Sequence, residues 1–244
     1  MLSQLQRQKI KDQLHQKLQQ LMVEGKFTPQ IATKEDNSLV TEVDQFLSDI
    51  IKIETSESVC FFSEEDHTKL TFPAVILDPI DGTIEFAQGV PECAVSYAAM
   101  KGPDLSEASA WIYNPFTGFE ISSDSTFTLP VKINKLKYLG LVSRSEWKKG
   151  LYDSIENGPV QLSPRGSIAF KLGLLATGAC DFVVSKKAKN IWDIAAGSIL
   201  LHQRGFSFYE KGIKLTSLNK ETYEAPLLWC RESDFILLSW TLGL

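Results

Sequence analysis

The stretch Asp78-Pro79-Ile80-Asp81-Gly82-Thr83 follows an apolar run, Ala74-Val75-Ile76-Leu77. The run is typical of a buried strand in a layered sheet, and the end of such a strand is where these proteins often place polar, functional side chains. Gly82 lets a ligand approach the backbone closely. Thr83 precedes a predicted helix over residues 84–88, whose free N–H groups suit a phosphate. Two carboxylates beside an anion site predict a divalent cation held against a phosphate ester.

Composition narrows the class of protein. The chain has 244 residues, 43% of them hydrophobic, which is enough for one large domain or two fused halves. The net charge of -5 provides no broad basic field for a nucleic-acid polymer. No apolar run approaches the roughly 20 residues that span a bilayer, and the first residues lack the apolar region of a signal peptide. Four scattered cysteines form no C-x-x-C pair. We therefore expect a cytoplasmic protein with a small-molecule partner and no membrane span.

Hydrophobic periodicity divides the chain into two kinds of pattern. Helices are predicted from about residue 10 toward Gly25 and over 41–53, 84–88, 167–177 and 192–204. Strands are predicted over 59–62, 74–77, 92–100, 108–113, 119–122, 139–143 and 181–185. This order predicts an α+β half followed by an α/β half. We place the first half at residues 1–132, with most of the acids, and the second at 133–244. No flexible linker separates the halves, so we expect one rigid unit.

Carboxylates recur at the ends of these predicted elements, namely Asp44, Glu64, Glu65, Asp78, Asp81 and Asp193. Taken alone, Asp193 could be an acid that stabilises a helix N-terminus, and Glu64 and Glu65 could be solvated loop charges. A turn, however, does not need both Asp78 and Asp81. Two carboxylates about 4 Å apart repel by about 4 kcal/mol at an effective dielectric constant of 20, and a divalent cation removes that conflict. Oxygen ligands favour Mg²⁺ or Mn²⁺ over Zn²⁺.

Positive charge is concentrated in the second half. Lys171 lies within the helix that Ser167 is expected to begin, and Lys186, Lys187 and Lys189 come just before Asp193. A run of lysines is usually a solvated face. Here the run lies a few residues from a candidate metal ligand, so it could equally bind an anionic substrate.

These residues together resemble the inositol monophosphatase superfamily of lithium-sensitive, magnesium-dependent phosphatases. Its D-P-[IL]-D-G-T and W-D-x-A-A-G signatures correspond to Asp78–Thr83 and to Trp192-Asp193-Ile194-Ala195-Ala196-Gly197, and a Glu-Glu pair precedes them. The resemblance extends from about Lys34 to Gly205. It implies an α+β fold, a layered α/β sandwich with mixed sheets between helix layers.

Within the superfamily, four segments resemble the 3'(2'),5'-bisphosphate nucleotidases: Lys34–Asp44, Ser63-Glu64-Glu65-Asp66, Thr83-Ile84-Glu85-Phe86 and Asn190-Ile191-Trp192-Asp193. Lysines also stand where inositol enzymes often carry a glutamate. Leu39 and Val43 depart from the nucleotidase pattern, and Gly166–Lys171 matches the G-S-S-L-K-F segment only loosely. Inositol-1-monophosphatase and histidinol-phosphate phosphatase are alternative branches. A metal- or nucleotide-binding sensor on the same fold is the non-enzymatic alternative.

The resemblance implies a phosphomonoesterase with two or three Mg²⁺ ions, for which Mn²⁺ could substitute. The implied metal ligands are Glu64, Asp78, Asp81, Asp193 and the carbonyl oxygen of Ile80. The implied catalytic residues, which orient or deprotonate the attacking water, are Thr41, Asp44, Glu64, Asp81 and Thr83. The implied substrate contacts are Gly82, Thr83, Ser167, Lys171, Lys186 and Lys189. We expect removal of the 3'-phosphate from adenosine 3',5'-bisphosphate by a monomer or homodimer.

Overall fold

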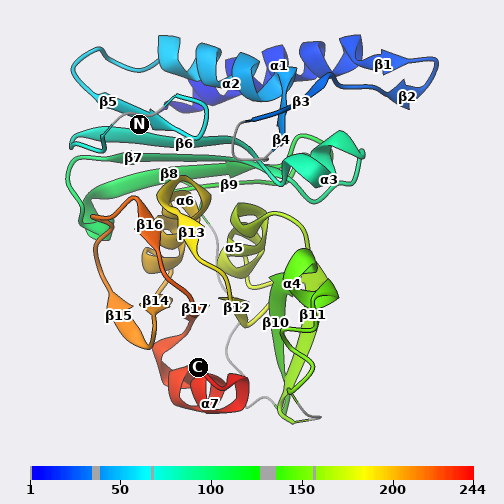
Figure 1. The fold of residues 1–244 in the computed structure, drawn as a ribbon. Coiled ribbons are helices and arrows are strands. Elements are labelled where there is room, and N and C mark those ends of the chain that lie inside the picture. Colours follow the sequence, from blue (N-terminus) through cyan, green and yellow to red (C-terminus); the bar gives the residue numbers. More distant parts are fainter. Residues whose placement is uncertain (1, 35–38, 67–68, 127–135, 156–157) are drawn as a thin grey trace.

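The computed structural model describes residues 2–34, 39–66, 69–126, 136–155 and 158–244. The predicted boundary between residues 132 and 133 and the centre of the Lys34–Asp44 segment lie outside these ranges. Figure 1 shows helices and sheets in alternating layers, with α1 and α2 on one outer side and α7 on the other. This arrangement confirms the expected α+β sandwich of mixed sheets between helix layers.

The first sheet carries the signature aspartates. Its strand order is β5 (Cys60–Ser63), β6 (Ala74–Asp81), β7 (Ala94–Met100), β8 (Ala108–Tyr113) and β9 (Glu120–Ser122). The β5–β6 pair is parallel and the other pairs are antiparallel. Helices α1 (Gln4–Gln20) and α2 (Glu42–Ile53) cover one face, because their apolar stripes are buried against it. Two short antiparallel ribbons connect these helices. The first pairs β1 (Met22–Val23) with β2 (Lys26–Phe27), and the second pairs β3 (Ile31–Thr33) with β4 (Leu39–Thr41).

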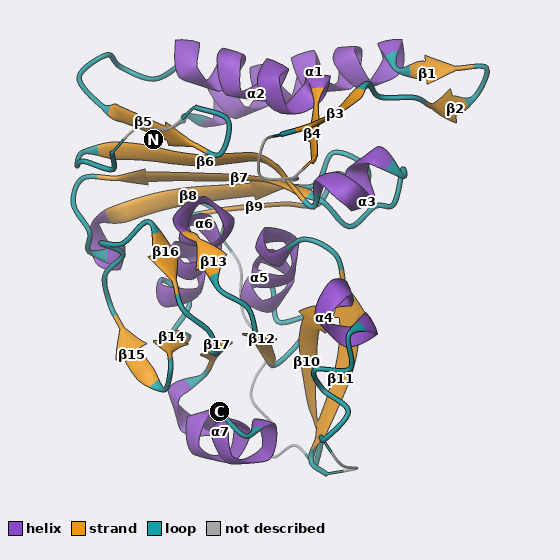
Figure 2. Cartoon of the chain, viewed as in Figure 1, coloured by secondary structure: helices purple, strands orange, loops and turns teal. Residues whose placement is uncertain are grey.

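The second sheet is built from the later part of the chain. Its order is β11 (Val160–Arg165), β10 (Tyr138–Ser143), β12 (Phe182–Ser185), β17 (Leu227–Cys230), β14 (Ser207–Glu210) and β15 (Ile213–Leu215). β10 is parallel to both β11 and β12, and the remaining pairs are antiparallel. Helices α4 (Arg144–Lys148) and α7 (Phe235–Leu242) flank this sheet, and β13 (Lys189–Asn190) pairs with β16 (Thr222–Tyr223) outside it (Figure 2).

Strand β6 is longer than the predicted segment 74–77, since it continues to Asp81. Its pairing with β7 is regular up to Asp78 and resumes at Asp81, with a register shift between them. Pro79 lies in that interval and has no N–H to donate to a ladder. A bulge of this kind redirects side chains at the end of a strand. It separates the two signature aspartates immediately before α3 (Thr83–Ala87).

Helices α5 (Ile168–Ala176) and α6 (Ile191–His202) lie between the two sheets, and their apolar residues belong to one core with residues of both sheets. The helices approach closely at Gly197, where an added Cβ would lie 2.4 Å from Leu172 Cβ. On the other side of α6, Trp229 Nε1 donates a hydrogen bond to Ser198 Oγ at 2.9 Å. The position of α6, and so of Asp193, is therefore fixed by both sheets.

The structure confirms, to within a few residues, the predicted helices over 41–53, 167–177 and 192–204. It also confirms the predicted strands, from the first at 59–62 to the last at 181–185, and only β6 differs by more. No element was predicted for the chain after Gly205. In the structure this part supplies β14, β15 and β17 to the second sheet, as well as β16 and α7. Among the described residues, no helix combines the length and apolar character that a bilayer span requires.

We expect Gly197→Ala to destabilise the protein. In an open helix this change gains about 1 kcal/mol from helix propensity. Here the new methyl group would lie 2.4 Å from Leu172 Cβ, so we expect a cost near the upper end of the about 1–3 kcal/mol range for overpacking, which leaves a net loss of about 2 kcal/mol. At about 2–4 °C per kcal/mol for a chain of this size, the melting temperature should fall by roughly 4–8 °C. Gly102→Ala is the control, since nothing lies within 4 Å of its added Cβ. Equal melting temperatures for Gly197→Ala and wild type would contradict the packing argument.

Candidate active site

Three aspartates converge between the first sheet and α6. Oxygen atoms of Asp78, Asp81 and Asp193 all lie within 4.8 Å of one another. Asp78 is 1% exposed, and its Oδ1 atom is buried without a hydrogen-bond partner in the described structure. A buried carboxylate oxygen without a partner is costly. The three side chains could together coordinate a hard divalent cation.

Local structure brings Asp193 to this point. Asn190 is the N-cap of α6, and its N–H donates to Asp193 Oδ2 at 2.9 Å, which fixes the carboxylate in the first turn. Ser96 Oγ on β7 donates to the carbonyl oxygen of Trp192 at 3.0 Å. The start of α6 is therefore attached to β7, and Asp193 faces the two aspartates of the neighbouring strand β6.

Burial and like charges destabilise the ionised forms of these acids. The pKa of Asp78 lies well above its usual range, first because the side chain is buried and then because Glu64, Asp81 and Asp193 carry negative charge nearby. Burial, followed by the charge of Asp81, raises the pKa of Asp193 to about 7. No described lysine, arginine or histidine forms an ion pair with Asp78, Asp81 or Asp193. The protein thus provides the cluster with no counter-charge in direct contact.

Glu64 lies beside the cluster but has a cationic partner. Lys34 Nζ is 3.0 Å from Glu64 Oε1 and 2.6 Å from Glu65 Oε1. Burial nevertheless raises the pKa of Glu64, and the charges of Glu65 and Asp81 contribute in the same direction. The structure therefore brings Glu64 near the three aspartates and pairs it with Lys34.

Thr41 and Asp44 form a buried pair at the N-terminus of α2. Asp44 Oδ2 accepts hydrogen bonds from Thr41 Oγ1 at 2.6 Å and Thr41 N at 2.7 Å. Asp44 Oδ1 is buried and has no hydrogen-bond partner among the residues that the structure describes. Burial raises the pKa of Asp44 to about 7, although the bonds from Thr41 act in the opposite direction. The negative charges of Glu65 and Glu64 also raise the pKa of Asp44. The charge of Asp44 in turn raises the pKa of Asp78, so the Thr41–Asp44 pair lies near the aspartate cluster.

The turn after β6 brings its backbone close to other parts of the site. Gly82 has φ +89°, and an added Cβ would lie 3.0 Å from the carbonyl oxygen of Glu92 and 3.1 Å from Ser167 Cβ. Glycine is therefore required both by its dihedral angle and by space. Thr83 Oγ1 donates to the carbonyl oxygen of Ile80 at 3.0 Å. The predicted ligand carbonyl of Ile80 and the predicted catalytic hydroxyl of Thr83 are thus in direct contact.

Asp81 also connects the end of β6 to the N-terminus of α5. Its Oδ2 atom accepts from Ser167 Oγ at 2.6 Å and from Ala169 N at 2.5 Å, at the N-terminus of α5. Free N–H groups at a helix N-terminus stabilise a carboxylate. Ser167 has φ +48°, a left-handed conformation that non-glycine residues adopt at some cost. The strained Ser167 is thus held against Asp81.

The predicted substrate lysines occupy different environments. Lys171 is buried, and its Nζ donates to the carbonyl oxygens of Ser167, Gly166 and Arg165 at 2.7, 3.2 and 3.3 Å. Burial lowers the pKa of Lys171 to about 8. Lys186 Nζ donates to the carbonyl oxygen of Leu151 at 3.0 Å and lies over the ring of Tyr152. Lys189 lines a cavity beside Asp81, and no hydrogen bond or ion pair involves its Nζ in the described structure.

This cavity has a volume of about 140 Å³ and extends from Asp81 toward Lys189 and Arg144. Arg144, on α4, was not among the predicted site residues. Its guanidinium pairs with Glu92, and its Nε atom is 3.7 Å from Glu85 Oε1. The sequence did hold a signal for it, since Arg144 directly follows the predicted apolar strand 139–143. A strand end followed by a cation suggests an anion-binding edge.

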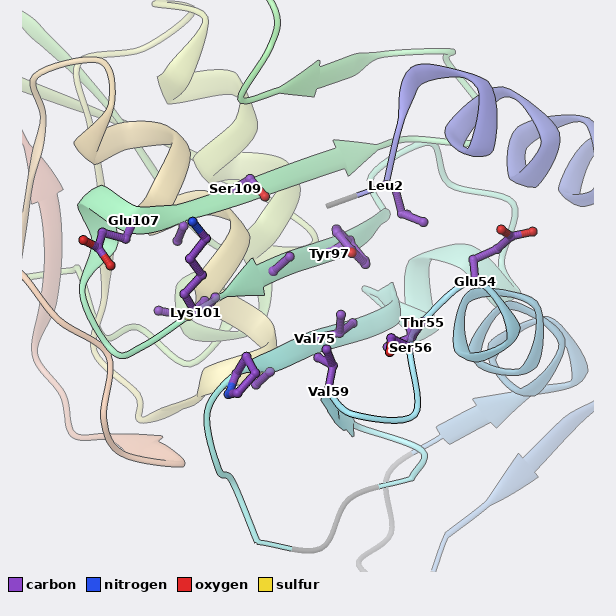
Figure 3. A pocket seen from close by; sticks show the side chains of 15 residues that line it. Leu2, Glu54, Thr55, Ser56, Val59, Val75, Tyr97, Lys101, Glu107 and Ser109 are labelled. Atoms are coloured by element: carbon purple, nitrogen blue, oxygen red, sulfur yellow. The ribbon is translucent and has the colours of Figure 1, made fainter.

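A larger cavity of about 480 Å³ lies at the other end of the first sheet. Figure 3 shows Val75, Tyr97 and Val59 in its wall, with Lys101, Glu107 and Ser109 at one end. Val75 is the second residue of β6, whereas Asp78 and Asp81 lie in its second half. None of the predicted site residues lines this larger cavity.

Comparison with curated proteins gives relatives of moderate and low identity. The chain is 35% identical over 136 residues to a fructose-1,6-bisphosphatase of Pyrococcus furiosus, which covers 54% of this chain and about half (53%) of that enzyme. It is 25% identical over 228 residues to the 3'(2'),5'-bisphosphate nucleotidase CysQ of Aggregatibacter actinomycetemcomitans, covering 80% of this chain and 81% of the relative. These relatives differ in substrate.

A solved IMPase of Thermotoga maritima has the same fold, with a TM-score of 0.75 at 18% identity, over 96% of this chain and 94% of that one. The model of the inositol monophosphatase family matches residues 2–220, which include the β6 aspartates, Lys189 and Asp193. The chain therefore belongs to the inositol monophosphatase family, whose members are Mg²⁺-dependent phosphatases.

Proposed function

We propose that this protein is a Mg²⁺-dependent phosphomonoesterase that removes the 3'-phosphate of adenosine 3',5'-bisphosphate. The observation that carries the reaction type is the convergence of Asp78, Asp81 and Asp193, which no cationic side chain of the described residues contacts, in a chain of this family. The preferred substrate rests on the cavity beside these acids and on the similarity to CysQ.

The donor atoms fit magnesium. The three aspartates offer only oxygen ligands, and the orphaned Oδ1 of buried Asp78 is the strongest indication that a cation belongs there. Asp78, Asp81 and Asp193 would hold the metal, together with Glu64 and the carbonyl oxygen of Ile80. When bound, Mg²⁺ supplies Lewis-acid polarisation of the phosphoryl group and of the attacking water.

We assign the other catalytic roles, orienting the water and accepting its proton, to side chains that already contact one another. Thr83 presents its hydroxyl beside the Ile80 carbonyl, and Thr41 presents its hydroxyl to Asp44. We propose that Thr83 and Glu64 orient the water. The Thr41–Asp44 pair then accepts its proton, since Asp44 with a pKa of about 7 can exchange a proton near neutral pH. The Gly82 and Thr83 N–H groups would bind phosphate oxygens, because Gly82 permits close approach.

Lys189 and Arg144 would bind a second phosphate of the substrate. Both side chains line the 140 Å³ cavity, and Lys189 Nζ is free of protein partners in the described structure. A cavity of this size encloses one phosphate group or sugar ring, so the base of a nucleotide would extend outside it. The names of both relatives described above specify a bisphosphate substrate. This agrees with a site that has cationic side chains in a cavity beside a proposed metal ligand, Asp81.

Fructose 1,6-bisphosphate is the second candidate substrate. The Pyrococcus furiosus fructose-1,6-bisphosphatase is the relative with the higher identity, although the match covers about half of its length. Inositol 1-phosphate and histidinol phosphate have one phosphate each and would leave Lys189 unused. A phosphate-release panel with all four compounds and Mg²⁺ tests the proposal, and we expect adenosine 3',5'-bisphosphate to give the highest kcat/KM.

Asp78→Asn and Asp193→Asn should each lower turnover by at least about 10³-fold, because loss of a metal ligand forfeits several kcal/mol of transition-state stabilisation. The measurement is Mg²⁺-dependent phosphate release at saturating substrate. Asp49→Asn is the matched control, since Asp49 is an exposed residue of α2 whose carboxylate accepts only from Gln45. Near-normal activity in either cluster variant would refute the metal-site assignment.

Stability without metal should fall as pH rises. Asp44 and Asp193 have a pKa of about 7 in the folded protein against 3.8 when unperturbed, so between these values the folded state binds more protons than the unfolded state. In EDTA, the melting temperature should therefore be lower at pH 8 than at pH 5.5. Millimolar Mg²⁺ should raise it at pH 8 by about 5–10 °C if the ion is near 100 times its Kd. A midpoint that is insensitive to both pH and Mg²⁺ would contradict a preformed acidic site.

Lys189→Ala should reduce kcat/KM for adenosine 3',5'-bisphosphate by about 10- to 100-fold, the value of one charge-assisted hydrogen bond. Hydrolysis of p-nitrophenyl phosphate, which has no second phosphate, should change by less than about threefold. Lys186→Ala is the matched control, because the Lys186 ammonium contacts Leu151 and Tyr152 instead of the cavity. If Lys186→Ala shows the larger selective loss, the substrate would have to approach from the other side of the lysine segment.

A further inference from the structure

Glu146 is a fully buried carboxylate outside the metal cluster. It lies in α4, two residues after Arg144, and its exposed fraction is 0%. Its carboxylate has no ion-pair partner among the described lysines, arginines and histidines. An acid in this position needs hydrogen bonds to offset its burial, and a purely structural role could be filled at lower cost by an apolar side chain.

The hydrogen bonds of Glu146 connect α4 to the segment that carries Lys189. Glu146 Oε2 accepts from Lys186 N at 3.1 Å and from the Tyr152 hydroxyl at 2.5 Å. Glu146 Oε1 accepts from Ser185 Oγ at 2.8 Å. Ser185 ends β12, and Lys187 N donates back to Ser185 Oγ at 3.3 Å. One carboxylate thus fixes the end of β12 and the beginning of the turn that leads to Lys189.

The two elements joined in this way carry the cationic groups of the cavity. Arg144 belongs to the same short helix as Glu146, and Lys189 begins β13, three residues after Lys186. Both side chains line the cavity beside Asp81, as do Ser143 and Ser185 at the adjoining strand ends. The separation of the two cations therefore depends on the contact between α4 and residues 185–187, at the centre of which Glu146 lies.

We propose that Glu146 is a positioning residue that sets the distance between Arg144 and Lys189, and thereby selects substrates with a second anionic group. The proposal rests on the proposed phosphatase function and deepens it. Glu146 contacts neither metal ligands nor the reacting phosphate, so its loss should alter recognition of the second anionic group rather than the chemical step. The carboxylate is suited to this role because its two oxygens accept from three donors on two segments, Tyr152 on one and Ser185 and Lys186 on the other.

Glu146→Gln tests this with almost no change in volume. The amide replaces one acceptor oxygen by a donor, which faces either Ser185 or the pair Tyr152 and Lys186. We expect KM for adenosine 3',5'-bisphosphate to rise by about tenfold, with kcat within a factor of two. KM and kcat for p-nitrophenyl phosphate should both stay within a factor of two. Glu224→Gln is the control, since Glu224 is an exposed acid paired with Lys211.

Tyr152→Phe gives a second, milder test that keeps the carboxylate. It removes one of the three donors and should give a smaller rise in KM for the bisphosphate in the same direction. Its melting temperature and that of Glu146→Gln are measured with Mg²⁺ to identify loss of folded protein. If both variants retain wild-type KM for the bisphosphate, or if KM for p-nitrophenyl phosphate rises equally, the positioning role is refuted. Absence of Mg²⁺-dependent p-nitrophenyl phosphate hydrolysis by the wild type would instead refute the phosphatase function itself.

Discussion

The mutual repulsion of Asp78, Asp81 and Asp193 is the constraint on which the rest of the site depends. At separations near 4 Å each ionised pair costs about 4 kcal/mol at an effective dielectric constant of 20. A protein of ordinary stability, about 5–15 kcal/mol, cannot tolerate several such pairs without compensation. The raised pKa values of Asp78 and Asp193 describe one compensation, protonation, and a bound divalent cation provides the other.

The chain's own cations are distributed unevenly around these acids. Lys34 pairs with Glu64 and Glu65, and Arg144 pairs with Glu92, whereas no described basic side chain pairs with the three aspartates. Lys171 is a buried lysine four residues after Ser167, which contacts Asp81. Its ammonium group donates its hydrogen bonds to backbone carbonyl oxygens. Basic side chains therefore pair with neighbouring acids, Glu64 among them, and in the described structure none pairs with the three aspartates themselves. This distribution explains why stability and metal binding should be coupled at Asp78.

Sequence reasoning located these acids because each one lies at one end of an element with strong periodicity. Asp78 follows an apolar strand and Asp193 lies in the first turn of a predicted helix, and the resemblance to the family implied that both ligate metal at one site. The same reasoning did not reach α4, because five residues are too few to show a helical period. Arg144 and Glu146 were missed for that reason. The chain after Gly205 was missed because its strands are two to four residues long and obtain their stability from β12 and α6.

The lysine segment shows a different limit of sequence reasoning. Lys171, Lys186 and Lys189 are chemically equivalent in the sequence: Lys186 and Lys189 were candidates because they precede Asp193 closely, and Lys171 because it lies in the helix that Ser167 begins. The structure separates them by their partners: Lys171 is occupied by carbonyl oxygens, Lys186 by Leu151 and Tyr152, and Lys189 faces the cavity. These outcomes depend on tertiary contacts with α4 and with the loop before α5. Local sequence does not encode such contacts.

The metal ligands and the proposed substrate contacts are held by different parts of the fold. Asp78, Asp81 and Asp193 lie on β6 and α6, which share the large core between the sheets. The proposed selectivity groups lie on α4 and β13, short elements near the edge of the second sheet. The Arg144 and Lys189 side chains form no hydrogen bond or ion pair with these three carboxylates in the described structure, so a change in either side chain can alter which substrate fits while the carboxylates keep their positions, although the backbone of β13 is tied to Asp193 through the Asn190 N–H group. This separation gives a physical reason why relatives that act on different phosphate esters can have the same fold.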